Sequence, residues 1–172
     1  GICFWRLTEN ESDAETAASR NVLTSSHGRN GWCEFLCNSD NQQPVNTISW
    51  SPDGRLLASG SVSSDHIYVW DVATTTCTPL VAAAACGVSL IKWSPSGHYV
   101  FAATLSNVVR VWETKTWTGE RWTIPTGPCQ SACWNPQGTL LLVAVAGCAD
   151  MWTFAFHHTP PHIFGVLADL RL

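Results

Sequence analysis

Tryptophan recurs along this chain at a nearly constant interval. Trp50, Trp93 and Trp134 are 43 and 41 residues apart, and each precedes a short turn sequence, Ser-Pro-Asp-Gly, Ser-Pro-Ser-Gly or Asn-Pro-Gln-Gly. A second series follows the first by 18 to 20 residues and consists of Trp70, Trp112 and Trp152. Two independent series with one period identify an internal repeat of about 40–45 residues.

Each repeat has the pattern of four short strands separated by turns. The first repeat predicts strands at 45–50, 56–61, 66–71 and, more weakly, 78–82. The second predicts strands at 88–93, 99–104, 107–112 and about 117–122. The third predicts strands at 129–134, 140–145, about 148–154 and about 163–168. Four strands within this period are typical of a β-propeller blade, so we expect an all-β fold in which the six repeated tryptophans pack between blades.

The turns of the repeat also have a physical basis. Proline presets φ and glycine tolerates a positive φ, so the Pro-x-Gly sequences suit tight turns between the first and second strands. Asp65 lies between the second and third strands, where a short carboxylate can accept hydrogen bonds from backbone N–H groups.

The chain is expected to begin inside a preceding blade. Residues 1–7 match the end of a third strand and about 32–38 a fourth, separated by a polar, solvated insertion at 8–31. The complete repeats are then 45–87, 88–128 and 129–172. Because three blades and part of another leave open strand edges, we expect a partial propeller from a ring of about seven blades.

Composition limits the classes of ligand. Charged residues make up 13% of the 172 residues, and the net charge is −4. The nine lysines and arginines are scattered, so we expect no direct contact with nucleic acid. No apolar run approaches the about 20 residues that span a bilayer, so any membrane association is expected to be indirect.

The repeat resembles the WD40 (WD-repeat) family. Ser-Pro-Asp-Gly at 51–54 and His-Ile-Tyr-Val-Trp-Asp at 66–71 carry the resemblance. The Trp-Asp pair survives only at Trp70-Asp71, and the Gly-His that usually precedes the first strand is absent from all three repeats. The buried His–Ser/Thr–Trp–Asp network of the family is therefore not expected to form in full, which leaves packing to hold the blades together.

A narrower similarity is to the WD-repeat nucleoporins of the nuclear pore complex. It covers about residues 33–154 and is most specific at 112–122 and 129–138. The resemblance implies a non-catalytic scaffold at the nuclear pore complex, on its cytoplasmic side, that supports nucleocytoplasmic transport of protein and mRNA. It also implies other nucleoporins as partners, among them a transmembrane nucleoporin that anchors the protein at the nuclear envelope.

The cysteines and histidines do not predict a metal or catalytic site. Cys33 and Cys37, like Cys129 and Cys133, are four residues apart in predicted strands, a separation of about 13 Å that is too long to share one ion. We expect these cysteines to be reduced thiols that pack in the sheets.

Three histidines at 157, 158 and 162 flank two prolines and are expected in a solvated loop. No nucleophile elbow or phosphate-binding loop is present in the sequence. We therefore expect no catalytic residue, metal, cofactor or small-molecule substrate.

Trp117 and Trp122 lie on a predicted outer strand, and two interpretations of them remain open. Exposed tryptophan is common at the centre of protein interfaces, so both are candidate partner contacts. Alternatively, a neighbouring loop covers them. Arg110 and Lys92 are expected near the channel or top face, in ion pairs with Glu113 or Asp71.

A second function class also remains open. The chain could be a generic WD40 adaptor that recognises peptides, such as a substrate receptor of a ubiquitin ligase. A scaffold predicts an apolar side patch near Trp117 and Trp122, whereas a peptide adaptor predicts a polar pocket at the mouth of the channel. An enzyme on a propeller has only analogy of fold in its favour.

Overall fold

The computed structural model describes residues 2–8, 23–24, 31–37, 44–74, 76–82, 86–149 and 151–156, and their regular structure is all β-strand. Within these residues no helix is long and apolar enough to cross a membrane. The chain divides into two compact units, residues 1–42 and 43–172.

The first unit contains one small antiparallel sheet. Its strands are β1 (Ile2–Thr8), β2 (Leu23–Thr24) and β3 (Gly31–Cys37), in the order β1-β3-β2. The strands expected at 1–7 and about 32–38 are present as β1 and β3 and pair with each other. β2 lies within the insertion at 8–31, whose polar composition did not predict a strand.

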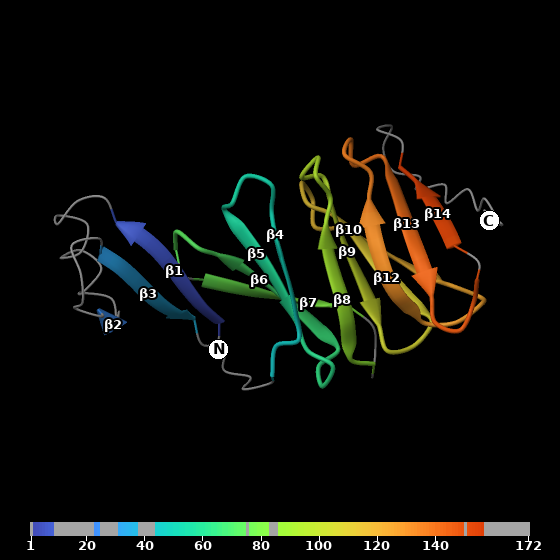
Figure 1. The fold of residues 1–172 in the computed structure, drawn as a ribbon, viewed down its shortest axis with the longest axis horizontal. Coiled ribbons are helices and arrows are strands. Elements are labelled where there is room, and N and C mark those ends of the chain that lie inside the picture. Colours follow the sequence, from blue (N-terminus) through green and yellow to red (C-terminus); the bar gives the residue numbers. More distant parts are fainter. Residues whose placement is uncertain are drawn as a thin grey trace. The chain divides into compact units, whose positions relative to one another are not determined.

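The second unit contains three antiparallel sheets in which strands that are consecutive in sequence are hydrogen-bonded neighbours (Figure 1). The first sheet consists of β4 (Thr47–Trp50), β5 (Leu56–Gly60), β6 (His66–Asp71) and β7 (Thr76–Val81). The second consists of β8 (Val88–Trp93), β9 (Tyr99–Thr104), β10 (Val108–Glu113) and β11 (Gly119–Thr123). The third consists of β12 (Cys129–Trp134), β13 (Leu140–Val145) and β14 (Met151–Ala155). These are the meandering sheets of propeller blades, and they do not close a ring.

Three predicted strands begin two or more residues later than expected, and the first of them is β4, which was predicted from 45 and begins at Thr47. The strand predicted at about 117–122 begins at Gly119, because Trp117 has a left-handed φ of 55° that a strand cannot contain. The strand predicted at about 148–154 begins at Met151, after a turn in which Gly147 has a φ of 75°. The strand predicted at about 163–168 lies outside the described residues.

One turn design recurs after the first strand of each of the three sheets in the second unit. Gly54, Gly97 and Gly138 have φ of 69°, 77° and 69°, as expected for the Pro-x-Gly sequences. The residue before each proline caps the turn with its side chain. Ser51 Oγ accepts the N–H of Leu56 at 2.8 Å, and Ser94 and Asn135 occupy the equivalent positions and accept the corresponding N–H groups. The side-chain oxygen thus fixes the start of the second strand.

The first strands of neighbouring blades lie side by side. Thr47 Oγ1 on β4 accepts the N–H of Ile91 at 3.0 Å, and Ser49 Oγ accepts the N–H of Trp93 at 2.8 Å. Between the next two blades, Trp134 Nε1 donates to the carbonyl oxygen of Lys92 at 3.3 Å. β4, β8 and β12 therefore form the inner edge of the unit, and β7 and β11 lie at the opposite, outer edge of their sheets.

Two apolar cores fill the spaces between the three sheets. The first includes Ile67 and Val69 of one blade together with Ile91 and Trp93 of the next. The second joins β9 and β10 to β12 and β13 and includes Trp134. Trp93 and Trp134 therefore each pack against the blade that precedes their own.

The repeated tryptophans are not equally buried. Trp93 and Trp134 are 7% and 9% exposed, and the third-strand residues Trp70 and Trp112 are also buried. Trp50, on the first strand of the first blade, is 46% exposed. Trp152 is half-buried, and its Nε1 donates to Thr126 Oγ1 at 2.8 Å. The expected packing between blades is thus observed for Trp93 and Trp134, which lie in the cores between described blades, and not for Trp50.

Part of the WD40 hydrogen-bond network is present in the first blade. Trp70 Nε1 donates to the buried Ser59 Oγ at 2.8 Å. Among the described residues, the Asp65 carboxylate contacts His66 Nδ1 at 2.6 Å and not the backbone N–H groups expected for it. Ser61 and Ser64 instead accept the backbone N–H groups of this turn. The retained Ser–Trp link adds a directional bond to the packing.

The difference in burial predicts different costs of truncation. Trp93→Ala removes a side chain from the core between two blades and should lower the free energy of unfolding by about 3–5 kcal/mol. Trp50→Ala, its counterpart in the repeat, should cost less than about 2 kcal/mol because nearly half of this side chain is already in solvent. Guanidinium unfolding of the two variants measures the difference, and equal losses would contradict the assignment of Trp93 to the core.

Candidate interaction groove

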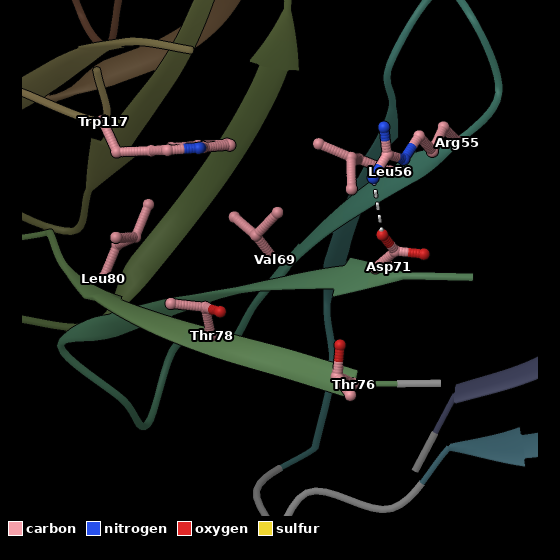
Figure 2. Close-up of a pocket in the computed structure, with 8 residues that line it drawn as sticks. All are labelled: Arg55, Leu56, Val69, Asp71, Thr76, Thr78, Leu80 and Trp117. Carbon is pink, nitrogen blue, oxygen red and sulfur yellow. Dashed lines mark hydrogen bonds and ion pairs between the residues drawn. The ribbon is translucent and has the colours of Figure 1, made fainter. Parts of the chain in front are cut away.

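A groove of about 500 Å³ opens between the outer strand of the first blade and a loop of the second (Figure 2). Its lining residues are Arg55, Leu56, Val69, Asp71, Thr76, Thr78, Leu80 and Trp117. The volume is within the range of about 300–1,000 Å³ typical of ligand pockets. Seven of these residues belong to one blade and Trp117 to the next, so the groove depends on how the two blades pack.

Strand alternation explains which residues line the groove. Thr76, Thr78 and Leu80 are every second residue of β7, so their side chains lie on one face of the sheet. Val69 and Asp71 have the same alternation on β6, and the two strands pair in register, with Val69 opposite Thr78. The groove is therefore the exposed part of one sheet face, roofed at one end by Trp117 (Figure 2).

The roofed end is apolar. Trp117 lies above Leu80, and Val69 occupies the middle of the floor (Figure 2). The Trp117 ring meets Trp93 edge to face, with 6.1 Å between ring centroids. The ring is therefore held against the core between the blades but remains half-buried, with part of its surface in the groove.

The backbone at Trp117 is unusual for so large a residue. Its φ of 55° lies in the left-handed region, which costs a non-glycine residue about 1–2 kcal/mol. The turn is fixed by the Trp117 N–H, which donates to the Glu113 carbonyl oxygen at 2.7 Å, and by Thr116 Oγ1, which donates to Glu113 Oε2 at 2.8 Å. The chain thus tolerates local strain to place an indole ring over the groove.

The other end of the groove is polar. Arg55 Nη2 lies 3.2 Å from Asp71 Oδ2, and the Arg55 side chain is 69% exposed. Asp71 Oδ1 also accepts the backbone N–H groups of Ala73 and Thr74 at 3.0 and 3.2 Å. These contacts hold the pKa of this carboxyl below its ordinary value. The hydrogen bond from the Thr74 N–H has the larger effect, and the bond from the Arg55 guanidinium has a smaller one.

Trp122, the second candidate contact residue, does not line the groove. Its ring stacks on Phe154 of the third blade, with 5.0 Å between centroids and 11° between planes. Its Nε1 donates to Glu120 Oε2 at 3.3 Å. The two tryptophans therefore contribute to different blade boundaries, although they are close in sequence.

The expected ion pairs of Arg110 are replaced by another contact. Arg110 Nη1 donates to the carbonyl oxygen of Val81, at the end of β7, at 2.7 Å, and its guanidinium lies 5.5 Å from the Trp112 ring centroid. Asp71 pairs with Arg55 instead. Arg110 thus links the third strand of one blade to the outer strand of the blade before it, and Lys92 is exposed.

Cys86, Cys129, Cys133 and Cys148 are free thiols. Cys129 is buried, as the packing role requires, and desolvation raises the pKa of its thiol to about 11. Cys133 and Cys148 are exposed, so the packing role expected of Cys133 is wrong. The side chains of Cys33 and Cys37 and the histidines at 157, 158 and 162 lie outside the described part of the structure. No group of three or more potential metal ligands occurs among the residues that are described.

The sequence predicts only part of the groove. It indicates Trp117 as a contact residue but does not indicate that Arg55 and the β7 side chains line the same groove. The signal for β7 was the alternation of Thr76, Thr78 and Leu80, which indicates a shared face without indicating what lies above it.

Comparisons with known proteins identify the family. The family model described as "Eukaryotic translation initiation factor eIF2A" matches residues 30–120. Aladin from Arabidopsis thaliana is 33% identical over 180 residues, which cover the whole chain and 40% of aladin. This match confirms the narrower resemblance found in the sequence.

More distant relatives match parts of the chain. "Periodic tryptophan protein 2 homolog" from Caenorhabditis elegans is 25% identical over 72% of the chain and 14% of its own length. "Protein HIRA" from Dictyostelium discoideum is 27% identical over 47% of the chain and 8% of its own length. The chain thus spans less than half the length of each of these relatives.

The contacts of Asp71 predict its acid titration. In an NMR pH titration its carboxyl should titrate below 3.8. Arg55→Gln should raise the pKa but not return it to 3.8, because the hydrogen bond from the Thr74 N–H has the larger effect and remains in the variant. Since the pKa of Asp71 is lower in the folded protein, its ionised carboxyl stabilises the fold. This stabilisation is complete above pH 3.8 and is lost as the pH falls through the pKa of the folded state. A titration midpoint at or above 3.8 would contradict the observed contacts.

Burial predicts an order of cysteine reactivity. At pH 8, iodoacetamide should alkylate the exposed Cys133 and Cys148 well before Cys129, whose thiol is buried and has a pKa of about 11. Because all three lie in one tryptic peptide, residues 122–171, tandem mass spectrometry that locates the alkylated cysteine within the peptide measures the order. In guanidinium the three rates should converge, and early modification of Cys129 in the folded protein would be inconsistent with its burial.

Proposed function

This chain belongs to the WD-repeat β-propeller proteins and, through residues 30–120, to the family described as eukaryotic translation initiation factor eIF2A, and we propose that it is a non-catalytic scaffold of the nuclear pore complex. The observation that carries the proposal is the 33% identity to aladin across the whole chain. The eIF2A model covers only part of the chain, so we base the function on the longer match.

The proposed partners are other nucleoporins. WD-repeat proteins are protein-interaction scaffolds, and the resemblance to the WD-repeat nucleoporins implies a transmembrane nucleoporin as the anchor at the nuclear envelope. In this role the protein would associate with the membrane indirectly, on the cytoplasmic side of the pore. It would support nucleocytoplasmic transport by positioning other components.

The geometry suits a scaffold because blades joined by apolar cores form a rigid support. The inner edge is occupied by contacts between blades, such as Ser49 Oγ with Trp93 N–H. The outer strands β7 and β11 end their sheets and present side chains outward. Docking of partners at the outer edge needs no chemical step, which is consistent with a non-catalytic protein.

The position of the groove also bears on the alternative function. A generic peptide adaptor was expected to carry a polar pocket at the mouth of the channel. The groove instead lies along β7, and Trp117 roofs one of its ends. This position supports the scaffold, for which a partly apolar side surface near Trp117 was expected.

Affinity capture of the intact protein from detergent-solubilised nuclear envelopes tests the proposal. The wild-type protein should capture pore components, including a transmembrane nucleoporin. Trp117→Ala should weaken capture if the groove contributes to docking. Trp122→Phe is the matched control, because it keeps an aromatic ring stacked on Phe154 and lies outside the groove.

The result separates the two function classes. Ubiquitin-ligase subunits in place of pore components would favour the adaptor. Absence of every pore component would contradict the scaffold proposal. Capture of pore components by the wild type and Trp117→Ala alike would support the scaffold and assign its docking surface to another part of the protein.

A further inference from the structure

The polar end of the groove offers donors rather than acceptors. The oxygens of Asp71 already accept N–H groups from Ala73, Thr74 and Arg55. A guanidinium carries several N–H donors, and in Arg55 one nitrogen is engaged by Asp71. Since this side chain is 69% exposed, a ligand that enters the groove can reach its positive charge and the N–H donors that Asp71 does not engage. A carboxylate fits this end because it can accept two parallel N–H bonds from one guanidinium.

The opposite end suits a bulky apolar side chain. Trp117 and Leu80 face the same space, and Val69 continues this apolar surface toward the polar end (Figure 2). The left-handed backbone at Trp117 keeps the indole above this surface at a local energetic cost. Aromatic side chains that remain partly exposed beside an apolar floor are effective anchors at protein interfaces.

We infer that this groove binds a short extended segment of a partner protein that carries a bulky apolar side chain and, a few residues away, a carboxylate. The apolar side chain packs between Trp117 and Leu80, and the carboxylate binds Arg55. The hydroxyl groups of Thr76 and Thr78 line the wall between the two ends and can hydrogen-bond the backbone of the segment. The inference deepens the proposed function, on which it rests for the presence of a protein partner.

The segment is expected to bind through its side chains and not as an added strand. β7 is the last strand of its sheet, and its outer edge could in principle pair with another chain. Pro79 in the middle of β7 lacks an N–H donor, which interrupts a continuous ladder of hydrogen bonds. Specificity therefore depends on the two ends of the groove.

Fluorescence polarisation with defined peptides tests the inference. The probes are fluorescein-labelled decapeptides of Gly and Ser that contain one Trp and one Glu, separated by two to five residues, each with a partner peptide in which Gln replaces Glu. With the intact protein, at least one Glu peptide should bind about three- to tenfold more tightly than its Gln partner, as expected for one exposed charged contact.

Variants assign that preference to the two ends of the groove. Arg55→Gln should weaken binding of the Glu peptide to the level of the Gln peptide and leave the Gln peptide unchanged. Trp117→Gly should weaken both peptides, although glycine relieves the left-handed strain at this position. Arg121→Gln, an exposed change on β11 outside the groove, is the control and should leave both affinities unchanged.

Circular dichroism and thermal unfolding establish that each variant is folded, and Trp117→Phe should recover part of the affinity. The inference is wrong if no probe binds the wild type, if Glu and Gln peptides bind equally, or if Arg55→Gln weakens both to the same degree. If nucleoporins are captured but the peptides give such a result, the proposed function stands and only the inference that the groove binds a peptide segment is rejected.

Discussion

Face-to-face packing of neighbouring blades is the interaction on which the rest of this structure depends. Each sheet exposes an apolar face that cannot be left in water, and Trp93 and Trp134 bury that face against the preceding blade. Hydrogen bonds such as Ser49 Oγ with Trp93 N–H, and the Arg110 contact with Val81, act on surfaces that this packing has already brought together. The groove is a consequence of the same packing, because Trp117 reaches the first blade only when the two sheets are aligned.

The sequence predicted local structure well where one residue type has one physical role. The strands at 88–93, 99–104, 129–134 and 140–145 have the predicted bounds. Their ends are set by turns in which glycine adopts a positive φ and Ser94 or Asn135 caps the following strand. Predictions failed where several residues can perform the same task. Asp65 was expected to cap its turn, but Ser61 and Ser64 do so, and the carboxylate contacts His66.

The groove was harder to predict than the strands because it depends on tertiary alignment. Arg55 and Asp71 are 16 residues apart and meet because β5 and β6 pair in one register. Trp117 comes from the next repeat and was expected within a strand, whereas its left-handed φ places it in the turn that roofs the groove. Alternation along β7 indicates which side chains share a face but not whether a neighbouring blade covers them.

The two edges of the blades differ in how their polar groups are satisfied, and this difference suggests where partners bind. At the inner edge, Thr47 and Ser49 satisfy N–H groups of the neighbouring strand, so that edge is engaged within the propeller. At the outer edge, Pro79 of β7 removes one donor. On the sheet face that forms the groove, the Arg55–Asp71 pair satisfies an acid while leaving guanidinium donors exposed. Packing and hydrogen bonding thus stabilise the inner edge, while the groove combines a constrained aromatic ring with an exposed positive charge. A scaffold assembled in this way can change its outer residues, and hence its partners, with little effect on the contacts that hold its blades together.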